Sequence, residues 1–202
     1  MNKCYIFAYS KEKINIEIEE DSCCICADAG YLTAPRCDLA IGDFDSMDVN
    51  NLPENIERKI LSTKKDETDT MAALQEAIKR GYKDITIVGG VSGDIAHTYA
   101  NITLLKYANE HGANANIISE TCEIYYIKNS MLELKNKVGR RISVFAYSEK
   151  AEGVNLKGFE YELENATLNN GNPIGVSNMV TADISIIALK NGEVIAILDN
   201  IC

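Results

Sequence analysis

The stretch that most constrains the fold of this chain is Ser22–Ala27, SCCICA. It is almost continuously apolar, whereas a strand with one solvent-facing side alternates apolar and polar residues. Strands buried on both faces are typical of parallel sheets, whose two sides are covered by other parts of the chain. We therefore expect Ser22–Ala27 to be a central strand of a parallel sheet.

Strand and helix patterns alternate through residues 1–123, which predicts an α/β domain with a mostly parallel sheet. Further strands are expected at Lys3–Tyr9, Ile14–Glu19, Leu39–Gly42, Arg58–Ser62, Asp84–Val88 and Asn116–Ser119. Helices are expected within Lys64–Gly81, with Met71, Leu74, Ala77 and Ile78 as the buried stripe, and at about Ile95–Glu110, with Ala100, Leu104 and Ala108 on one face.

The start of the first helix is less sharply defined than its end at Gly81. Either Asp66 or Thr68 can cap it, because both side chains carry an oxygen that accepts a backbone N–H. If the first turn begins by Asp66, Asp66 and Asp69 lie three residues apart on one side of the helix.

Residues 124–202 have a different pattern, which predicts a small all-β sandwich. Short strands are expected at Glu123–Lys128, Met131–Leu134, Arg141–Tyr147, Phe159–Leu163, Ala182–Leu189 and Glu193–Leu198. Asn191-Gly192 stands between two of these runs and is a strong signal for a hairpin turn.

Composition excludes several classes of function. The net charge of −10 argues against a nucleic-acid surface. The apolar runs are far shorter than a membrane span, and Met1–Ser10 does not read as a signal peptide. Seven cysteines without two paired clusters favour reduced, buried thiols over a zinc site, so we expect a cytoplasmic protein with no membrane partner.

Acidic residues follow the predicted strands. Asp43 and Asp45 flank Phe44 directly after Leu39–Gly42, and extended geometry would place both carboxylates on one side. Mg²⁺ suits such a pair, because it takes oxygen ligands together with substrate phosphates. Standing alone, the segment could equally be a solvated acidic turn.

The glycine-rich loop Gly89–Gly93, GGVSG, opens the second helix and can present backbone N–H groups to a phosphate. The same glycines would also serve a tight turn, and the Gly-Lys-Ser/Thr ending of a P-loop is missing. His97 is either a phosphate ligand or a cap of the helix start.

Taken in order, these motifs resemble thiamine pyrophosphokinases over nearly the whole chain. The matching segments are Asp28-Ala29-Gly30, GDFDS at Gly42–Ser46, KDETD at Lys65–Asp69, the GGVSG loop with His97 and Asn101, and Gly175-Val176-Ser177-Asn178. The resemblance implies a catalytic α/β domain at 1–123, a thiamine-binding β-sandwich at 124–202 and a homodimer. It also implies that a pyrophosphoryl group passes from ATP, the co-substrate, to the hydroxyl of thiamine, with Mg²⁺, giving thiamine diphosphate and AMP.

The resemblance also implies residue roles. The catalytic group would be Asp43, Asp45, Asp66 and Asp69, of which Asp43, Asp45 and Asp69 would hold the metal. ATP would be bound by Asp28, Gly30, Gly42, Lys65, Gly89, Gly90, Ser92, Gly93 and His97. Thiamine would be bound by Ser46, Thr68, Ser177 and Asn178, although from the residues alone Ser177-Asn178 reads as a turn before a strand.

The loop departs from the family pattern G-G-x-x-G-R-x-D-H at two positions. Asp94 stands in the place of the arginine and Ala96 in the place of the aspartate, while His97 remains. An aspartate at a phosphate site adds repulsion where an arginine would bind. Two alternatives therefore stay open: a weakened paralogue that binds thiamine diphosphate or a nucleotide, and a pyrophosphokinase for another small alcohol.

Overall fold

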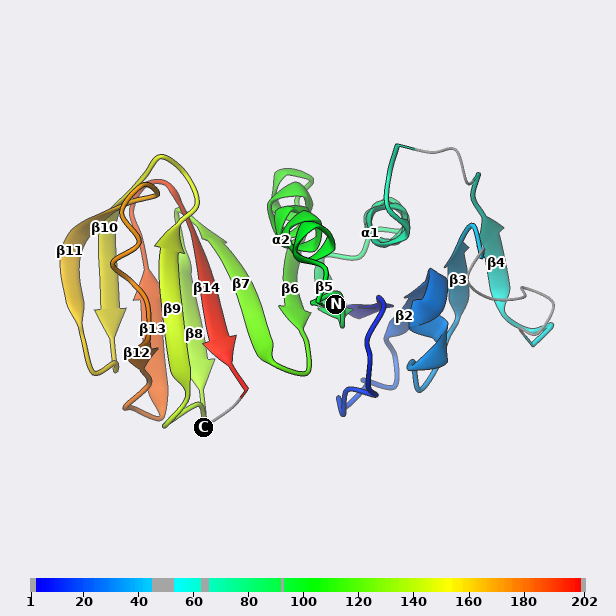
Figure 1. The fold of residues 1–202 in the computed structure, drawn as a ribbon, viewed down its shortest axis with the longest axis horizontal. Helices are drawn as coiled ribbons and strands as arrows, with labels where there is room; N and C mark the ends of the chain where they lie inside the picture. Colours follow the sequence, from blue (N-terminus) through cyan, green and yellow to red (C-terminus); the bar gives the residue numbers. More distant parts are fainter. Residues whose placement is uncertain (1–2, 45–52, 63–65, 92, 201–202) are drawn as a thin grey trace. The chain divides into compact units, whose positions relative to one another are not determined.

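The computed structural model describes residues 3–44, 53–62, 66–91 and 93–200 (Figure 1). The chain divides into two compact units, Met1–Glu120 and Thr121–Cys202. The first is an α/β unit and the second is all-β, which confirms the predicted order of the two fold types.

In the described residues of the first unit, the strands lie side by side in the order β6–β5–β1–β2–β3–β4, and each neighbouring pair is parallel. The strands are β1 (Lys3–Phe7), β2 (Cys23–Ala27), β3 (Leu39–Gly42), β4 (Glu57–Ile60), β5 (Asp84–Val88) and β6 (Asn114–Ile118). Every residue of β2 is buried, as its apolar run predicts.

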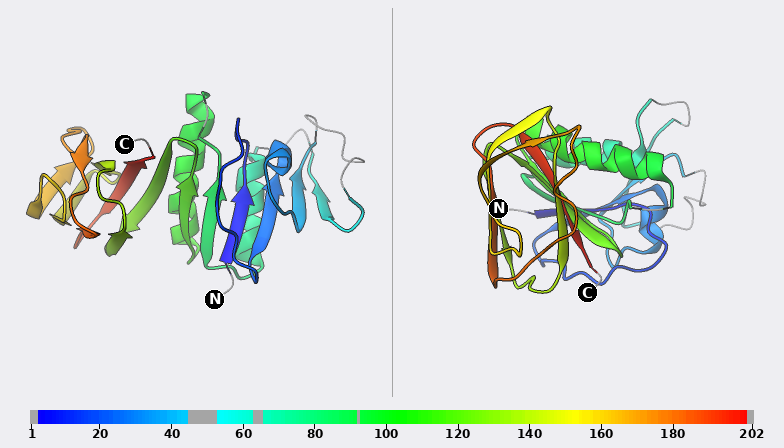
Figure 2. Two further views of the ribbon diagram at one scale, coloured as in Figure 1. Left: turned by 90° about the horizontal axis from the view of Figure 1, so that it is seen from below. Right: turned by 60° about the vertical axis from the view of Figure 1, so that its left-hand side comes forward.

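The two faces of this sheet are covered differently. Helices α1 (Asp69–Lys79) and α2 (Ile95–Glu110) contact each other and lie on one face (Figures 1 and 2). On the other face, Ile14, Ile16 and Ile18 pack against a cluster that includes Phe7 and Cys26.

The predicted strand at Ile14–Glu19 is therefore wrong, although its alternation is meaningful. In the described part of the chain this segment joins no sheet. The alternate isoleucines all face the sheet, so the segment covers β1 and β2 but does not pair with them. A short 3₁₀ helix, η1 (Asp28–Leu32), adds Tyr31 to the same cover.

Helix α1 begins later than the first acidic residue of its segment. Thr68 is the N-cap, because its Oγ1 accepts the Met71 N–H at 3.2 Å. Asp66 thus lies before the helix, and the shared face with Asp69 that an earlier start would give is not formed.

The predicted stripe of α1 is only partly correct. Leu74 and Ala77 are buried, whereas Met71 and Ile78 are half-buried. The buried face consists of small or short side chains together with one carboxylate: Thr70, Ala72, Ala73, Leu74, Glu76 and Ala77. It is broader than a single stripe because α1 packs against both the sheet and α2.

Glu76 is the charged member of that buried face. Its carboxylate accepts hydrogen bonds from Lys59 Nζ at 2.8 Å and from Arg80 Nε at 2.9 Å. These bonds lower the pKa of Glu76 to about 2. Arg80 also reaches Glu57 at 2.6 Å, so the network ties α1 to the edge strand β4.

Two antiparallel sheets form the second unit, in the orders β12–β9–β14–β7 and β11–β10–β13–β8. The first contains β7 (Cys122–Lys128), β9 (Arg141–Ala146), β12 (Asn178–Met179) and β14 (Glu193–Asp199). The second contains β8 (Met131–Lys135), β10 (Lys150–Lys157), β11 (Leu163–Asn169) and β13 (Ile184–Ala188). One hydrophobic core draws residues from both sheets, for example Val144, Val154 and Ile187.

The predicted hairpin at Asn191-Gly192 is wrong. The strands on either side, β13 and β14, belong to different sheets. Gly192 does take a left-handed φ of +102°, as a turn requires, but the turn carries the chain from one sheet to the other.

The strand predicted at Phe159–Leu163 is also absent from the described structure, since β11 begins only at Leu163. Strands β10 and β11 flank this segment, and the sequence analysis missed both. The sequence of β10 is KAEGVNLK and that of β11 is LENATLN, so each carries too many small or polar residues to give an apolar run.

Two further expectations concern cysteines and membranes. The cysteines at 4, 23, 24, 26, 37 and 122 are free thiols. Within the described ranges, the longest and most apolar helices still fall short of what is needed to cross a membrane.

Candidate active site

The carboxyl ends of the parallel strands gather the polar residues of the first unit at one edge of the sheet. Ala8 and Tyr9 follow β1, Asp28 follows β2, Asp43 follows β3, and Gly89 and Gly90 follow β5. In open α/β sheets ligands bind outside this edge.

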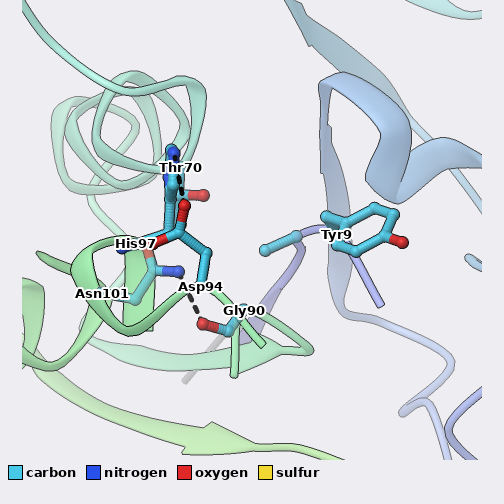
Figure 3. A pocket seen from close by; sticks show the side chains of 7 residues that line it. Tyr9, Thr70, Gly90, Asp94, His97 and Asn101 are labelled. Atoms are coloured by element: carbon cyan, nitrogen blue, oxygen red, sulfur yellow. Dashed lines mark hydrogen bonds and ion pairs between the residues drawn. The ribbon is translucent and has the colours of Figure 1, made fainter. Parts of the chain in front are cut away.

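A pocket of about 300 Å³ opens there (Figure 3). It is lined by Ala8, Tyr9, Thr70, Gly90, Asp94, His97 and Asn101. These residues come from the end of β1, the first turn of α1, the loop after β5 and the start of α2. Tyr9 stands across the pocket from Thr70, Asp94 and Asn101.

The glycines after β5 are required by backbone shape. Gly89 and Gly90 have φ values of +87° and +73°. A Cβ on Gly89 would lie 2.8 Å from the Ala8 carbonyl oxygen, and one on Gly90 would lie 2.8 Å from Asn101 Nδ2. A side chain at either position would therefore be strained and would clash.

The N–H groups of these two glycines already have acceptors. Gly89 donates to the Ile118 carbonyl at 2.8 Å, and Gly90 donates to the Tyr9 carbonyl at 2.9 Å. Asn101 Nδ2 donates to the Gly90 carbonyl at 2.8 Å and fixes the loop to α2. The described loop thus matches the tight-turn interpretation, since these N–H groups point to carbonyls.

Asp94 caps the start of α2. Its Oδ1 accepts the N–H of Ala96 at 2.8 Å and that of His97 at 3.2 Å. The His97 ring is therefore not the cap. It is largely exposed, lines the pocket and lies 4.0 Å from the Asp94 carboxylate.

The residues after β2 and β3 pack closely together. A Cβ on Gly30 would lie 2.0 Å from the Phe7 carbonyl oxygen, and one on Gly42 would lie 3.1 Å from Asp28 Cα. Gly30 therefore lets η1 sit against β1, and Gly42 brings Asp28 beside the end of β3. Asp28 takes a φ of +43°, which is uncommon for a residue with a side chain.

The carboxylates predicted to hold a metal are only partly described. Asp43 follows β3, and Asp69 is the first residue of α1, which contacts β3. Asp45, Ser46, Lys65 and Ser92 lie outside the described residues. In the ranges that are described, no three acidic, histidine or cysteine side chains gather as a metal site.

In the second unit, Ser177 and Asn178 have unequal surroundings. Ser177 is exposed, with a φ of +60°, and its N–H donates to Ser143 Oγ at 3.1 Å. Asn178 is buried: its Oδ1 accepts the Tyr161 N–H at 3.0 Å, and its Nδ2 donates to the Tyr161 carbonyl at 2.7 Å. The Asn178 amide thus clamps the backbone of Tyr161, whose own side chain is exposed.

Comparison with known families identifies both units. The family model described as thiamin pyrophosphokinase, catalytic domain, matches residues 14–117, and the model for the vitamin B1 binding domain of the same family matches residues 129–193. The chain belongs to the thiamin pyrophosphokinase family.

Known members of the thiamin pyrophosphokinase family share sequence and fold with this chain. Thiamine pyrophosphokinase of Bacillus subtilis (strain 168) is 28% identical over 145 residues, which are 69% of this chain and 67% of that protein. The crystal structure of the B. subtilis enzyme superposes with a TM-score of 0.87 at 23% identity, covering 98% of this chain and 99% of that one. The enzyme of Candida albicans gives a TM-score of 0.79 at 14% identity, covering 98% and 88%. At these identities the structural likeness shows the common fold.

Some lining residues of this thiamin pyrophosphokinase family member escape sequence analysis. Tyr9 and Thr70 line the pocket, yet neither belongs to a recognisable motif. Thr70 follows directly after Asp69, and this position in the first turn of α1 is the only sequence feature that could have indicated its place in the site. Thr68, predicted to contact thiamine, uses its hydroxyl oxygen as the cap of α1.

Proposed function

We propose that this protein transfers a pyrophosphoryl group from ATP to the hydroxyl of thiamine, giving thiamine diphosphate and AMP. The observation that carries the proposal is the paired match of the two family models. The catalytic-domain model falls on the unit with acidic residues at the carboxyl edge of its sheet, and the B1-binding model falls on the unit with Ser177 and Asn178.

The acidic residues suit Mg²⁺, which prefers carboxylate oxygens and substrate phosphates as ligands. Asp43 and Asp69 are carboxylates on adjoining elements of the first unit, which supports the fit. We assign the metal to Asp43, Asp45 and Asp69, with Asp66 nearby. Bound there, Mg²⁺ would neutralise charge on the transferred phosphates.

The contribution of the chain is positioning, as is usual in phosphoryl transfer. The thiamine hydroxyl attacks the β-phosphorus of ATP in line, and AMP leaves. The proposed ATP contacts are Asp28, Gly30, Gly42, Lys65, Gly89, Gly90, Ser92, Gly93 and His97. Because the N–H groups of Gly89 and Gly90 are bonded to carbonyls, these two glycines would contribute shape rather than phosphate contacts.

Thiamine is assigned to the second unit, whose two antiparallel sheets with a common core we interpret as a β-sandwich. Ser177 is the proposed thiamine contact of this unit. We assign Asn178 a supporting role as well, since its amide orients Tyr161. A homodimer would cover exposed strand edges of the sandwich. The free thiols support a reducing cytoplasm as the location.

A coupled assay for AMP tests the proposal. The purified protein is incubated with ATP and Mg²⁺, with and without thiamine, and AMP is measured. We expect AMP formation that depends on thiamine. Binding of thiamine diphosphate without AMP formation would favour a non-catalytic paralogue, and AMP formation only with another alcohol would favour a different acceptor.

A further inference from the structure

The loop after β1 is tied to a glutamate that follows β6. Ser10 Oγ lies 2.5 Å from Glu120 Oε1, and the Glu12 N–H donates to the same oxygen at 3.4 Å. Ser10 Oγ also lies 2.5 Å from the Glu12 carbonyl oxygen, so its hydroxyl hydrogen can serve either acceptor. The side chain of Glu120 thus holds the loop at two of its residues.

This connection passes over a strand that lies between its two ends. In the sheet β5 separates β1 from β6, so the contact from Ser10 to Glu120 crosses the end of β5. A Cβ on Gly89, the first residue after β5, would lie 3.1 Å from Ser10 Cβ. Gly90 donates its N–H to the Tyr9 carbonyl at 2.9 Å. The segments that follow β1, β5 and β6 are therefore held against one another.

Glu120 serves as a charged acceptor in this arrangement. Its side chain is half-buried, and burial alone would raise the pKa of its carboxyl. The Ser10 hydroxyl and backbone N–H groups, including those of Glu12 and Lys11, outweigh burial and lower the pKa of Glu120 below its ordinary value. An ionised carboxylate accepts several hydrogen bonds and donates none, which suits a group that gathers the N–H and O–H groups of a loop.

Tyr9 is the pocket residue that this arrangement places. Its carbonyl is bonded to the Gly90 N–H, and the next residue, Ser10, contacts Glu120. The Tyr9 side chain is 57% exposed and stands across the pocket from Asp94 (Figure 3). Because so much of the side chain is in solvent, contacts of the backbone on either side fix its position more than packing of the ring does.

We propose that Glu120 is a positioning residue of the reaction. By holding Ser10 and Glu12, it fixes the loop after β1, and with it Tyr9, at the carboxyl edge of the sheet. This inference rests on the proposed function, because the loop is fixed against the glycine turn that is proposed to shape the ATP site. Glu120 acts through the loop and is assigned no contact with either substrate.

The expected effect follows from how often a released loop is in place. A ligand that needs one loop position binds more weakly in proportion to the fraction of time that the loop spends there. If the released loop were in place about a tenth of the time, the apparent affinity would fall about 10-fold. The loss should fall on ATP, since thiamine is assigned to the second unit.

Calorimetric binding of Mg·ATP without thiamine tests the inference without turnover. Glu120→Ala removes the acceptor and should weaken binding about 10-fold. Glu120→Gln keeps an oxygen at the place of Oε1, to which Ser10 and Glu12 both donate, and should bind within about 3-fold of the unmodified protein.

Two further variants complete the comparison. Ser10→Ala releases the loop from the other side and should weaken binding by roughly 3- to 10-fold, which keeps the test open if Glu120→Ala does not fold. Glu20→Ala is the matched control. Glu20 is exposed and precedes β2, at the opposite edge of the sheet, so its loss makes the same change of charge and should leave binding unchanged.

Two other measurements separate positioning from stability. Hydrogen–deuterium exchange of the segment 8–13 should become faster in Glu120→Ala, while α2 keeps its protection. In the AMP assay, Glu120→Ala should raise KM for ATP about 10-fold and leave KM for thiamine unchanged. A variant that had only lost stability would contain less active protein, which lowers apparent kcat without raising KM for ATP alone.

Several results would overturn the inference. They are absence of Mg·ATP binding by the unmodified protein, unchanged binding in both Glu120→Ala and Ser10→Ala, and an equal loss in Glu120→Ala and the Glu20→Ala control. Mg·ATP binding that depends on Glu120 in a protein that forms no AMP would contradict only the proposed function. AMP formation with an unchanged KM for ATP in Glu120→Ala would contradict only this inference.

Discussion

Asp94 Oδ1 accepts the backbone N–H of Ala96 at 2.8 Å, which makes Asp94 the N-cap of α2. The same oxygen accepts the N–H of His97 at 3.2 Å. Helix starts favour negative charge, and Asp is among the best N-cap residues. Asp94 thus caps the start of α2 and also places a carboxylate in the lining of the pocket.

The cap makes a prediction about stability. Asp94→Ala should lower the free energy of unfolding by about 1 kcal/mol, the usual cost of losing a helix cap. Asp94→Asn, which keeps the acceptor oxygen, should lose much less. Urea denaturation of both variants measures the difference. Equal stability of Asp94→Ala and the unmodified protein would show that the cap contributes nothing.

The metal assignment predicts loss of turnover when a carboxylate is neutralised. Asp43→Asn should lower AMP formation by roughly 100-fold or more, because charge that holds the proposed cation is removed. Asp45→Asn should behave alike. The fold should persist in circular dichroism, since Asp43 is only half-buried after β3. Mg²⁺ titration curves of turnover that are unchanged in both variants would contradict the assignment.

A comparison of variants at Asn178 and Ser177 distinguishes a residue that stabilises the fold from one whose side chain is exposed. Its amide makes two hydrogen bonds with the Tyr161 backbone, so Asn178→Ala should cost about 1–3 kcal/mol of unfolding free energy. Ser177→Ala should leave stability nearly unchanged, since its side chain is exposed. Urea denaturation of the two variants makes the comparison. A stable Asn178→Ala variant would mean that the clamp is weak.

The hydrogen bonds of Glu76 predict that the free energy of unfolding decreases in acid. Its hydrogen bonds with Lys59 and Arg80 hold its pKa at about 2, below the ordinary value of 4.5. Because the folded pKa is depressed, the stabilisation is complete above pH 4.5 and is lost as pH falls toward 2. Glu76→Gln should therefore show a smaller decrease in unfolding free energy over that range. Parallel pH profiles of the variant and the unmodified protein would contradict the network's role.

The surroundings of Cys23 predict that the pKa of its thiol is lower than that of an ordinary cysteine. The adjacent Cys4 thiol, on the neighbouring strand β1, is the main cause that lowers the pKa of Cys23 below its ordinary value of 9. Thiolate absorbance of the unmodified protein should therefore begin to rise at a lower pH than that of an ordinary thiol. Cys23→Ser should remove this step, and Cys4→Ala should move it upward. A first thiolate transition near pH 9 in the unmodified protein would be inconsistent with the pair.

The sequence predicts the first unit better than the second because of how each buries its strands. Continuous apolar runs such as Cys23–Ala27 mark strands buried on both faces, and the spans of β5 and α2 match the expected ranges. Strands β10 and β11 are half-exposed and rich in small polar residues, so periodicity does not reveal them. Asn191-Gly192 fits a hairpin locally, but its strands join different sheets of a common core.

Site prediction was limited in a similar way. Motifs marked Gly89, Gly90 and His97, which the structure brings to one edge of the sheet. They could not show that the glycine N–H groups bond to the carbonyls of Ile118 and Tyr9, since those contacts join distant parts of the chain. Tyr9 and Thr70 are identified as candidate site residues only because they line the pocket of the folded structure.

Phosphorus NMR of the reaction products tests the central claim most directly. The protein is incubated with ATP, thiamine and Mg²⁺, and the spectrum is followed over time. Transfer of a pyrophosphoryl group predicts that the signals of AMP and of the diphosphate of thiamine diphosphate rise together in equal amounts. Formation of ADP with thiamine monophosphate, or no change in ATP while thiamine is present, would contradict the assignment of this chain as a thiamine pyrophosphokinase.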